Sequence, residues 1–222
     1  EKPFVWPKIV TEGPFEPWLQ KLHKEKSISV DIEYGPISGR IRCIGVGTKT
    51  LGVSIPLAPE GTTSLRDIHA LEQLLDNPKI EKVFHNAPSD LRELAKRNWK
   101  IRGKVFDTLR AHAIVASQLP HNLSLVAAIE FPGVPNWKTE FKIEGDDKGK
   151  VLQRFEKAPL KDLLPYNAKD NIVQAMLAKR LKKRLAQTFN GASLYKNLME
   201  CMHVGLDMTN VGVRVEKASF EG

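Results

Sequence analysis

The feature that most constrains the fold is a run of three strand patterns followed by alternating helix and strand patterns. From Ser27 onward, apolar and polar residues alternate with the period of two that is typical of a strand. Two more apolar runs, residues 41–46 and 51–55, follow after short connections. Because antiparallel neighbours need only short turns, we predict an antiparallel three-stranded meander.

The rest of the chain alternates helical patterns with short apolar runs. A helix is predicted after Ser64, which forms a capping-box pattern with Asp67. The later elements are predicted as a strand at 80–84, a helix at 88–98, a strand at 105–106, helices at 108–119 and 122–129, and a long helix at 162–187. The segment 131–159 is rich in Gly, Pro and Lys and is predicted to be irregular. This order is typical of an α/β domain with a mixed sheet between helices.

Composition narrows the class of protein. The 222-residue chain carries 34 Lys and Arg against 26 Asp and Glu, a net charge of +8 that favours polyanionic partners such as nucleic acid. Its two cysteines are too few for a disulfide scaffold or a zinc-finger array. No apolar run approaches the roughly 20 residues of a membrane helix, and no signal-peptide pattern opens the chain. Since it begins at Glu1 and not Met, we expect a piece of a longer protein. As its location we expect a bacterial cytoplasm or a virus-infected host cell.

The first predicted strand carries two acidic residues on one face. Asp31 and Glu33 are two residues apart, so both side chains project from the same side, about 7 Å apart along the backbone. Burying two carboxylates without compensation is costly, and a divalent cation between them removes that cost. A solvent-facing edge strand with harmless acids is the alternative. The apolar residues around the pair indicate a central strand, so we favour a metal site.

Further acidic residues lie on the helical segments. Asp90 would lie in the first turn of a helix, where the helix dipole favours an anion, and the amide of Asn86 can bond to backbone or to a phosphate. Tyr166 and Asp170 are i and i+4 on the last long helix, so they share a face. Each placement alone is common for structural reasons. The order strand, helix start, helix is more specific than any one of them.

These motifs, in this order, resemble the three exonuclease motifs of the DEDDy branch of the DnaQ-like 3′–5′ exonucleases. The matching residues are Asp31-Ile32-Glu33, Asn86-xxx-Asp90 and Tyr166-xxx-Asp170. More narrowly, the pattern is similar to the proofreading exonuclease domain of a family A DNA polymerase, which also has an Asp-Thr step like Asp107-Thr108 after the second motif. The resemblance implies an RNase H-like fold with a five-stranded mixed sheet flanked by helices.

The resemblance also implies a domain layout and partners. It makes residues 1–26 a lead-in segment, 27–190 the exonuclease domain, and 191–222 the start of a polymerase domain in the same longer chain. The substrate would be the single-stranded 3′ end of DNA, with no membrane partner. The product would be a nucleoside 5′-monophosphate.

The roles of the motif residues follow from the same resemblance. Two ions, Mg²⁺ or Mn²⁺, are implied as cofactors, because hard cations prefer oxygen ligands. Asp31, Glu33 and Asp170 would bind one ion. Asp31 and Asp90 would hold the second, and Tyr166 would orient the attacking water.

Substrate contacts and departures from the family lie between the motifs. Ile37 falls where the family places an apolar wedge against the terminal base, and Phe141 is a candidate for a second stacking contact. The amide of Asn86 is the third candidate substrate contact. Ser89 replaces an aromatic residue that usually precedes the second-motif Asp, and Tyr34 replaces a Thr. Basic residues that could follow phosphates are Arg110, Lys138, Lys142, Lys148 and Lys150.

Two other functions remain open from the sequence. A ribonuclease D-type RNA 3′–5′ exonuclease would share the same four acids, but a helical RNA-binding domain should then follow. A non-catalytic nucleic-acid-binding domain on the same fold is the other alternative, and such domains usually lack one or more of the acids.

Overall fold

A mixed sheet forms the centre of the molecule in the computed structural model, which describes residues 3–35, 37–57, 59, 61, 63–139 and 155–212. The strand order is β1-β4-β3-β2-β5-β6. The strands are β1 (Lys8–Val10), β2 (Ser27–Tyr34), β3 (Ile41–Thr48), β4 (Leu51–Pro56), β5 (Glu81–Phe84) and β6 (Val105–Asp107). Strands β2, β3 and β4 form the predicted antiparallel meander, whereas β5 and β6 continue the sheet in parallel with β2.

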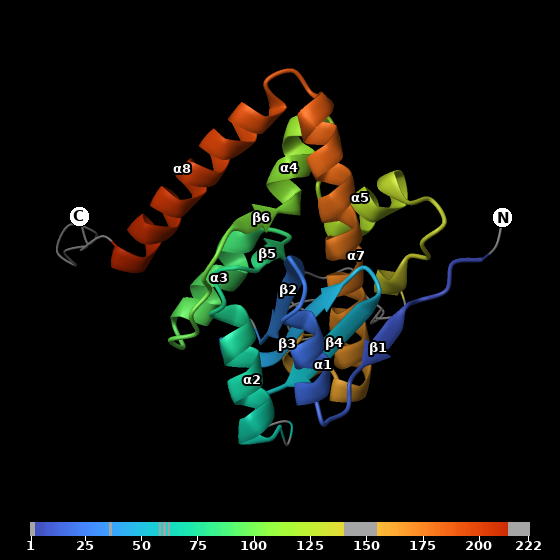
Figure 1. Ribbon diagram of the computed structural model, residues 1–222, viewed down its shortest axis with the longest axis vertical. Coiled ribbons are helices and arrows are strands. Elements are labelled where there is room, and N and C mark those ends of the chain that lie inside the picture. Colours follow the sequence, from blue (N-terminus) through green and yellow to red (C-terminus); the bar gives the residue numbers. More distant parts are fainter. Residues whose placement is uncertain are drawn as a thin grey trace, which may run out of the picture.

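Helices cover both faces of this sheet (Figure 1). They are α1 (Glu16–Leu22), α2 (Leu65–Leu75), α3 (Ala87–Ala95), α4 (Thr108–Val115), α5 (Leu123–Glu130), the 3₁₀ helix η1 (Trp137–Thr139), α7 (Leu160–Gln187) and α8 (Gly191–Val211). The predicted cap of α2 is present, since the Asp67 N–H donates to Ser64 Oγ at 3.1 Å. The predicted α/β class, a mixed sheet between helices, is therefore confirmed.

The number of strands differs from the prediction, because the sheet has six strands and not five. The additional strand is β1, which pairs in parallel with β4 from Lys8 opposite Leu51 to Val10 opposite Val53. Without β1, β4 would be an edge strand with a row of unpaired N–H and C=O groups, which an extended segment can satisfy. The segment predicted as a lead-in thus adds a strand to the sheet, and its helix α1 packs against α2.

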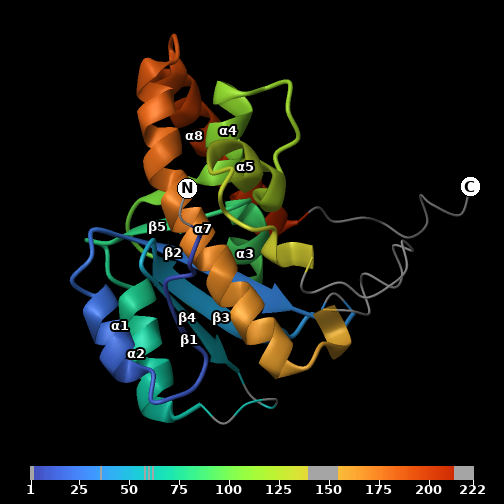
Figure 2. The ribbon, with the colours of Figure 1, turned by 90° about the vertical axis from the view of Figure 1, so that its right-hand side faces the viewer.

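The alternation in β2 decides which side chains reach which core. Ile28, Val30 and Ile32 are buried together with the leucines of α1 and α2 on one face. Asp31 and Glu33 consequently point to the opposite face, which α7 crosses (Figure 2). This arrangement excludes the solvent-facing edge strand, because β2 has neighbours on both sides and helices on both faces.

Two glycines allow α7 to lie close to the sheet. Gly45 of β3 is directly opposite Asp31, and a Cβ there would collide with the side chains of Asn167 and Asn171. Gly52 of β4 is equally close to the backbone of α7, since a Cβ would lie 2.5 Å from the Ala168 carbonyl oxygen. The glycines therefore leave room for polar side chains of α7 beside the acidic residues of β2.

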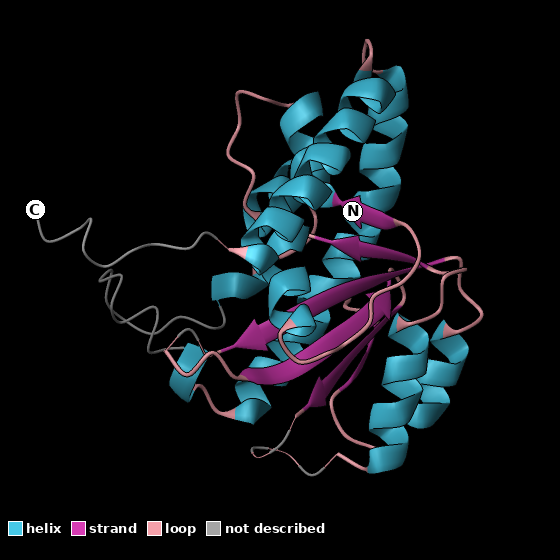
Figure 3. Cartoon of the chain, turned by 90° about the vertical axis from the view of Figure 1, so that its left-hand side faces the viewer, coloured by secondary structure: helices cyan, strands magenta, loops and turns pink. Residues whose placement is uncertain are grey.

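The last two helices, α7 and α8, extend past the edge of the sheet. Helix α7 extends beyond the strands, and α8 turns back from its end to pack against α4 and α3 (Figure 1). Figure 3 shows the sheet as one layer with helices on either side of it. No helix in the described ranges is both long enough and apolar enough to cross a lipid bilayer.

Candidate active site

One pocket, with a volume of about 330 Å³, collects the predicted catalytic residues. It lies where β2 and β5 end, beside the start of α3 and the first half of α7. Its lining includes Asp31, Glu33, Asn86, Asp90, Tyr166 and Asp170. Residues that are up to about 140 positions apart in the chain thus meet in one place, as expected for a site built at the carboxyl ends of neighbouring parallel strands.

Three carboxylates form the tight centre of the pocket. Asp31, Glu33 and Asp170 each offer an oxygen, and these oxygens lie within 4.8 Å of one another. Asp170 and Glu33 are only 4% and 9% exposed. Asp90 is also buried, at 6% exposure, in the first turn of α3 and lines the same pocket. The pocket therefore holds four carboxylates, three of them in direct proximity.

The electrostatics of these acids are unfavourable without a cation. Burial, followed by the charge of Asp170, raises the pKa of Asp31 to about 7. Burial and then the charge of Asp31 raise the pKa values of Glu33 and Asp90 well above their usual range. Burial also raises the pKa of Asp170. Four acids that resist ionisation together indicate a site that is completed by positive charge.

Side chains of α7 fix the orientation of Asp31. Asn167 Nδ2 donates to one carboxylate oxygen at 2.8 Å, and Gln174 Nε2 donates to the other at 3.0 Å. Asn167 is itself oriented, because its Oδ1 accepts from Ser54 Oγ at 2.7 Å. The sequence reasoning missed both amides, although Gln174 lies four residues after Asp170 and hence on the same helix face.

Two residues of η1 donate hydrogen bonds to the two carboxylate oxygens of Asp170. Trp137 Nε1 donates to Oδ1 at 2.5 Å, and Lys138 Nζ donates to Oδ2 at 3.1 Å. Lys138 Nζ also donates to the Tyr166 hydroxyl at 2.8 Å. Sequence reasoning offered Lys138 as a phosphate contact and missed Trp137. The structure places the Lys138 ammonium among the acids.

The pKa of Lys138 reflects this position. Burial by itself lowers the pKa, but the charges of Asp170, Glu33 and Asp31 outweigh burial and raise it above its usual value. Lys138 is thus a charged group whose neighbours are carboxylates from β2 and α7.

The start of α3 is held by a buried acid outside the pocket's centre. Asp107 accepts the N–H groups of Asn86 at 3.1 Å and Ala87 at 2.9 Å, and it also caps α4. Asn86 takes the left-handed backbone conformation with φ of 74°, which Asn tolerates better than most residues. Pro88 lies in the first turn, where its missing N–H costs nothing. The unusual Pro88 and Ser89 therefore leave Asp90 in the wall of the pocket.

The predicted substrate contacts are less clearly placed. Ile37 lies on the β2–β3 connection and is 68% exposed, and it is not among the residues that line the pocket. Its N–H and that of Ser38 donate to Glu156 at 3.3 and 3.2 Å, so the connection is tied to the segment before α7. Arg110 pairs with Asp107 and thereby supports the α4 cap. Phe141, Lys142, Lys148 and Lys150 lie outside the described residues.

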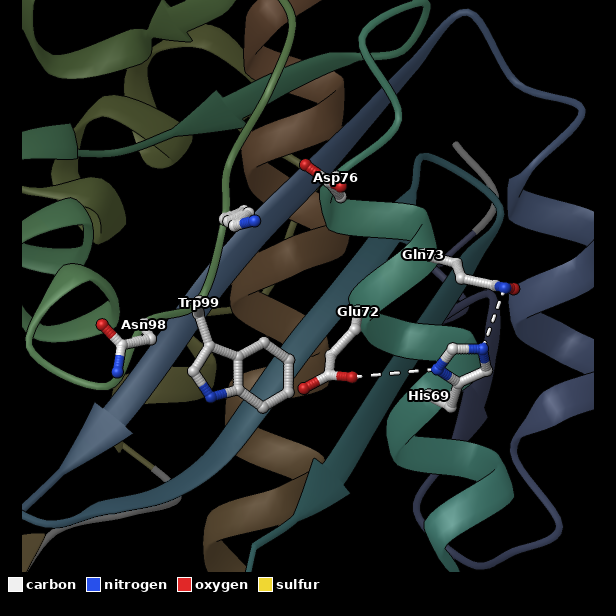
Figure 4. Close-up of a pocket in the computed structure, with 7 residues that line it drawn as sticks. His69, Glu72, Gln73, Asp76, Asn98 and Trp99 are labelled. Atoms are coloured by element: carbon white, nitrogen blue, oxygen red, sulfur yellow. Dashed lines mark hydrogen bonds and ion pairs between the residues drawn. The ribbon is translucent and has the colours of Figure 1, made fainter.

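A second pocket, of about 310 Å³, lies between α2 and the loop after α3 (Figure 4). Its lining residues are His69, Glu72, Gln73, Asp76, Asn98, Trp99 and Lys100. Polar groups there contact one another, with His69 at 3.9 Å from Glu72 and 3.0 Å from Gln73. None of the predicted site residues lines this pocket, so we place the candidate active site at the acidic pocket.

The acidic pocket fits a hard divalent cation. The tight group of Asp31, Glu33 and Asp170 offers carboxylate oxygens, which Mg²⁺ and Mn²⁺ prefer and which suit zinc less well. Burial and the mutual repulsion of the acids raise their pKa values, and a bound cation would oppose both effects.

Solved structures with similar folds include a polymerase domain and an exoribonuclease. The POL domain of Pol1 from M. smegmatis, in complex with DNA primer-template and dNTP, has a TM-score of 0.65 at 19% identity, covering 94% of this chain and 33% of that one. Escherichia coli RNase D has a TM-score of 0.63 at 16% identity, covering 91% of this chain and 51% of that one. Brucella melitensis NrnC with bound Mg²⁺ has a TM-score of 0.62 at 17% identity, covering 96% of this chain and 100% of that one. The fold is therefore RNase H-like, as predicted.

Comparison by sequence is more specific. DNA polymerase I of Chloroflexus aurantiacus is 25% identical over 186 residues, 78% of this chain and 19% of that protein. DNA polymerase I of Pseudomonas aeruginosa is 27% identical over 190 residues, 80% of this chain and 20% of that protein. This chain thus spans about a fifth of these curated relatives. A family described as 3′–5′ exonuclease matches residues 8–186, and the chain belongs to this exonuclease family of the DNA polymerase A type.

Proposed function

We propose that this chain is a metal-dependent proofreading module that removes nucleotides from the single-stranded 3′ end of DNA. The observation that carries the proposal is the meeting of Asp31, Glu33, Asp90, Tyr166 and Asp170 in one buried pocket. Membership of the 3′–5′ exonuclease family supports the reaction, and the net charge of +8 suits a polyanionic substrate. The product is a nucleoside 5′-monophosphate.

The acids are assigned by their geometry. Asp31, Glu33 and Asp170 would hold one Mg²⁺ or Mn²⁺ ion, because their oxygens lie within 4.8 Å of one another. Asp31 and Asp90 would hold the second, as the resemblance implies, since both line the same pocket. Such ions, when bound, supply Lewis-acid stabilisation of the charge that develops on the phosphodiester and its leaving oxygen.

The other polar residues prepare the site before substrate arrives. Asn167 and Gln174 hold the Asp31 carboxylate in a fixed plane, and Trp137 does the same for Asp170. Tyr166 has its hydroxyl in the pocket, where it would orient a water molecule for attack on the terminal phosphodiester. Fixed ligands lower the reorganisation needed during reaction.

A frayed single strand is the substrate that suits a buried carboxylate pocket. We expect a duplex end to require separation of its 3′ strand before the terminal phosphodiester reaches the acids, since Glu33, Asp90 and Asp170 are buried. Exposed Ile37 would pack as a wedge against the terminal base, and Asn86 at the pocket rim would bond to the strand. Phe141 is proposed as a second stacking contact.

The larger protein is proposed to be a DNA polymerase. Both curated relatives are bacterial DNA polymerase I proteins about five times the length of their match to this chain. We propose that residues 27–190 form the exonuclease domain, which β1 extends, and that residues 191–222 begin the polymerase domain. A bacterial cytoplasm or an infected cell is the corresponding location.

An RNA substrate is the second candidate, for a specific reason. The fold is about as similar to E. coli RNase D, an exoribonuclease, as to the polymerase, with TM-scores of 0.63 and 0.65. The four acids do not discriminate DNA from RNA, because both present the same phosphodiester.

The test uses 5′-labelled single-stranded DNA and RNA of one sequence, incubated with the protein in Mg²⁺, Mn²⁺ or EDTA. We expect stepwise shortening of DNA from the 3′ end in either metal and none in EDTA. Asp31→Ala should abolish shortening while circular dichroism and thermal unfolding stay native, because the substitution relieves repulsion among buried acids. Lys179→Met, an exposed change on α7, is the control that should cleave normally.

Each outcome decides between functions. Shortening of RNA alone supports the ribonuclease D-type reading. No shortening of either substrate, by a protein that is folded and loaded with metal, excludes the catalytic proposal and leaves a nucleic-acid-binding domain.

A further inference from the structure

Lys138 brings a positive charge to the group of carboxylates that would bind a cation. Its ammonium lies 3.1 Å from Asp170 Oδ2 and 2.8 Å from the Tyr166 hydroxyl, and it interacts with the charges of Glu33 and Asp31. The ammonium thus contacts Asp170 directly, and Asp170 belongs with Asp31 and Glu33 to the tight group whose oxygens lie within 4.8 Å of one another. A divalent cation bound by those three acids would use the same Asp170 carboxylate.

The position of Lys138 is imposed by its neighbour in the chain. Trp137 is only 2% exposed, donates its indole N–H to Asp170 Oδ1, and packs edge-on against Trp6 with ring centroids 5.7 Å apart. This anchor fixes the η1 backbone beside α7 whatever the lysine side chain does. The ammonium is therefore delivered to the acids by the fold, and its long side chain can still change conformation, since 31% of it is exposed.

A divalent cation and the Lys138 ammonium would compete for the Asp170 carboxylate. At a separation of about 4 Å, like charges in a partly buried site repel by several times the thermal energy. Without any cation, the three carboxylates repel one another instead. A cation bound at Asp170 is therefore favourable, and a divalent ion that binds there would weaken the contact with the Lys138 ammonium.

We propose, on the basis of the proposed function, that Lys138 is a built-in counter-ion that partly offsets the negative charge of the carboxylate pocket until a divalent cation enters. Metal binding then displaces the ammonium from Asp170, and the side chain swings toward the exposed mouth of the pocket. Lys138 is a positioning residue in this scheme, because it keeps the ligands together and competes with the ion. It lowers the affinity for metal and raises the stability of the metal-free protein.

The first test follows Lys138 in the unaltered protein. The protein is treated with a limiting amount of an acetylating reagent in EDTA, and again with saturating Mn²⁺, and the acetylation rate of each lysine is measured by mass spectrometry. We expect Lys138 to react slowly in EDTA and at least fivefold faster in Mn²⁺. Lys179, exposed on the same α7 helix that carries Asp170, is the internal control and should react equally in both.

The second test compares Lys138→Met with Lys179→Met, which remove the same charge at different places. By calorimetric titration at pH 8, Lys138→Met should bind Mn²⁺ at least tenfold more tightly than the unaltered protein. In EDTA it should unfold at a lower temperature, and Mn²⁺ should raise that temperature by more than it does for the unaltered protein. Lys138→Arg, which restores the charge, should return both properties toward the original values.

The outcomes separate this proposal from the proposed function. An unchanged acetylation rate for Lys138 in Mn²⁺, or equal or weaker Mn²⁺ binding by Lys138→Met, overturns the counter-ion role even if the protein cleaves DNA. Faster acetylation and tighter binding support it even if no nucleic acid is cleaved. Because acetylation is measured on the unaltered chain, a variant that does not fold leaves the test intact.

Discussion

Two buried carboxylates on the same helix, α3, have pKa values shifted in opposite directions. Asp90 is 6% exposed and Glu93, one turn later, is 4% exposed. Asp90 faces the other acids, and burial together with the charge of Asp31 raises its pKa well above the usual range. For Glu93 burial acts in the same direction, but the hydrogen bond and charge of Lys96 and the charges of Arg92 and Arg97 lower its pKa.

The difference lies in where the positive partners come from. Glu93 contacts Lys96 at 2.7 Å, so the chain supplies its counter-charge. Asp67, another buried acid, accepts the N–H groups of Phe15 and Glu16 at 2.8 and 2.6 Å. The acids around Asp31 are given too few donors for their number. A carboxylate that the protein itself satisfies is structural, whereas a group of carboxylates left short of positive charge is prepared for a ligand.

Of the substitutions in these two carboxylates, we expect neutralisation of Asp90 to have the largest effect on cleavage. Asp90→Asn should lower the cleavage rate about a thousandfold, equivalent to about 4 kcal/mol of lost transition-state stabilisation, because the proposed second ion loses a ligand. The free energy of unfolding in EDTA should stay the same or rise, since one repelling charge is gone. Single-turnover cleavage and urea unfolding measure the two quantities. A variant that cleaves DNA at the normal rate would remove Asp90 from the site.

The pH dependence of stability should also distinguish the acids around Asp31 from the acids that have partners within the chain. The pKa of Asp31 is about 7 in the folded chain against 3.8 for the free group, so between these values the folded state binds the extra proton. The free energy of unfolding in EDTA should therefore fall as pH rises through this window, by about 3 kcal/mol between pH 5 and 8 from this residue. Urea unfolding across this range should show the fall in the original protein and a flatter profile in Asp31→Asn. Parallel profiles would mean that Asp31 is not the titrating group.

The smallest effect is expected at the satisfied acid. Glu93→Gln should lower the free energy of unfolding by about 1 to 2 kcal/mol, because three cations that are partly exposed lose their common partner. The cleavage rate of the folded variant should match the original, since Glu93 does not line the acidic pocket. Urea unfolding together with the DNA assay checks both. A large loss of activity without a loss of stability would erase the contrast with Asp90.

Much of the site could be anticipated because its parts are local patterns. The alternation in β2 places Asp31 and Glu33 on one face, and the spacing of Tyr166 and Asp170 places them on one side of α7. Such relations depend only on the period of a strand or a helix. The partners of these acids could not be anticipated in the same way. Trp137 and Lys138 lie in a segment predicted to be irregular, where no period relates one side chain to the next.

Local sequence patterns were enough to predict the acidic face of β2 and the positions of the acids along the helices. The folded chain was needed to show that Asn167 and Gln174 bond to Asp31 from 136 and 143 residues away, that β1 pairs with β4, and that the Lys138 ammonium contacts Asp170. The physical reason is distance along the chain. Backbone periodicity fixes neighbours within a few residues, whereas contacts between remote segments depend on how the packed helices and sheet meet.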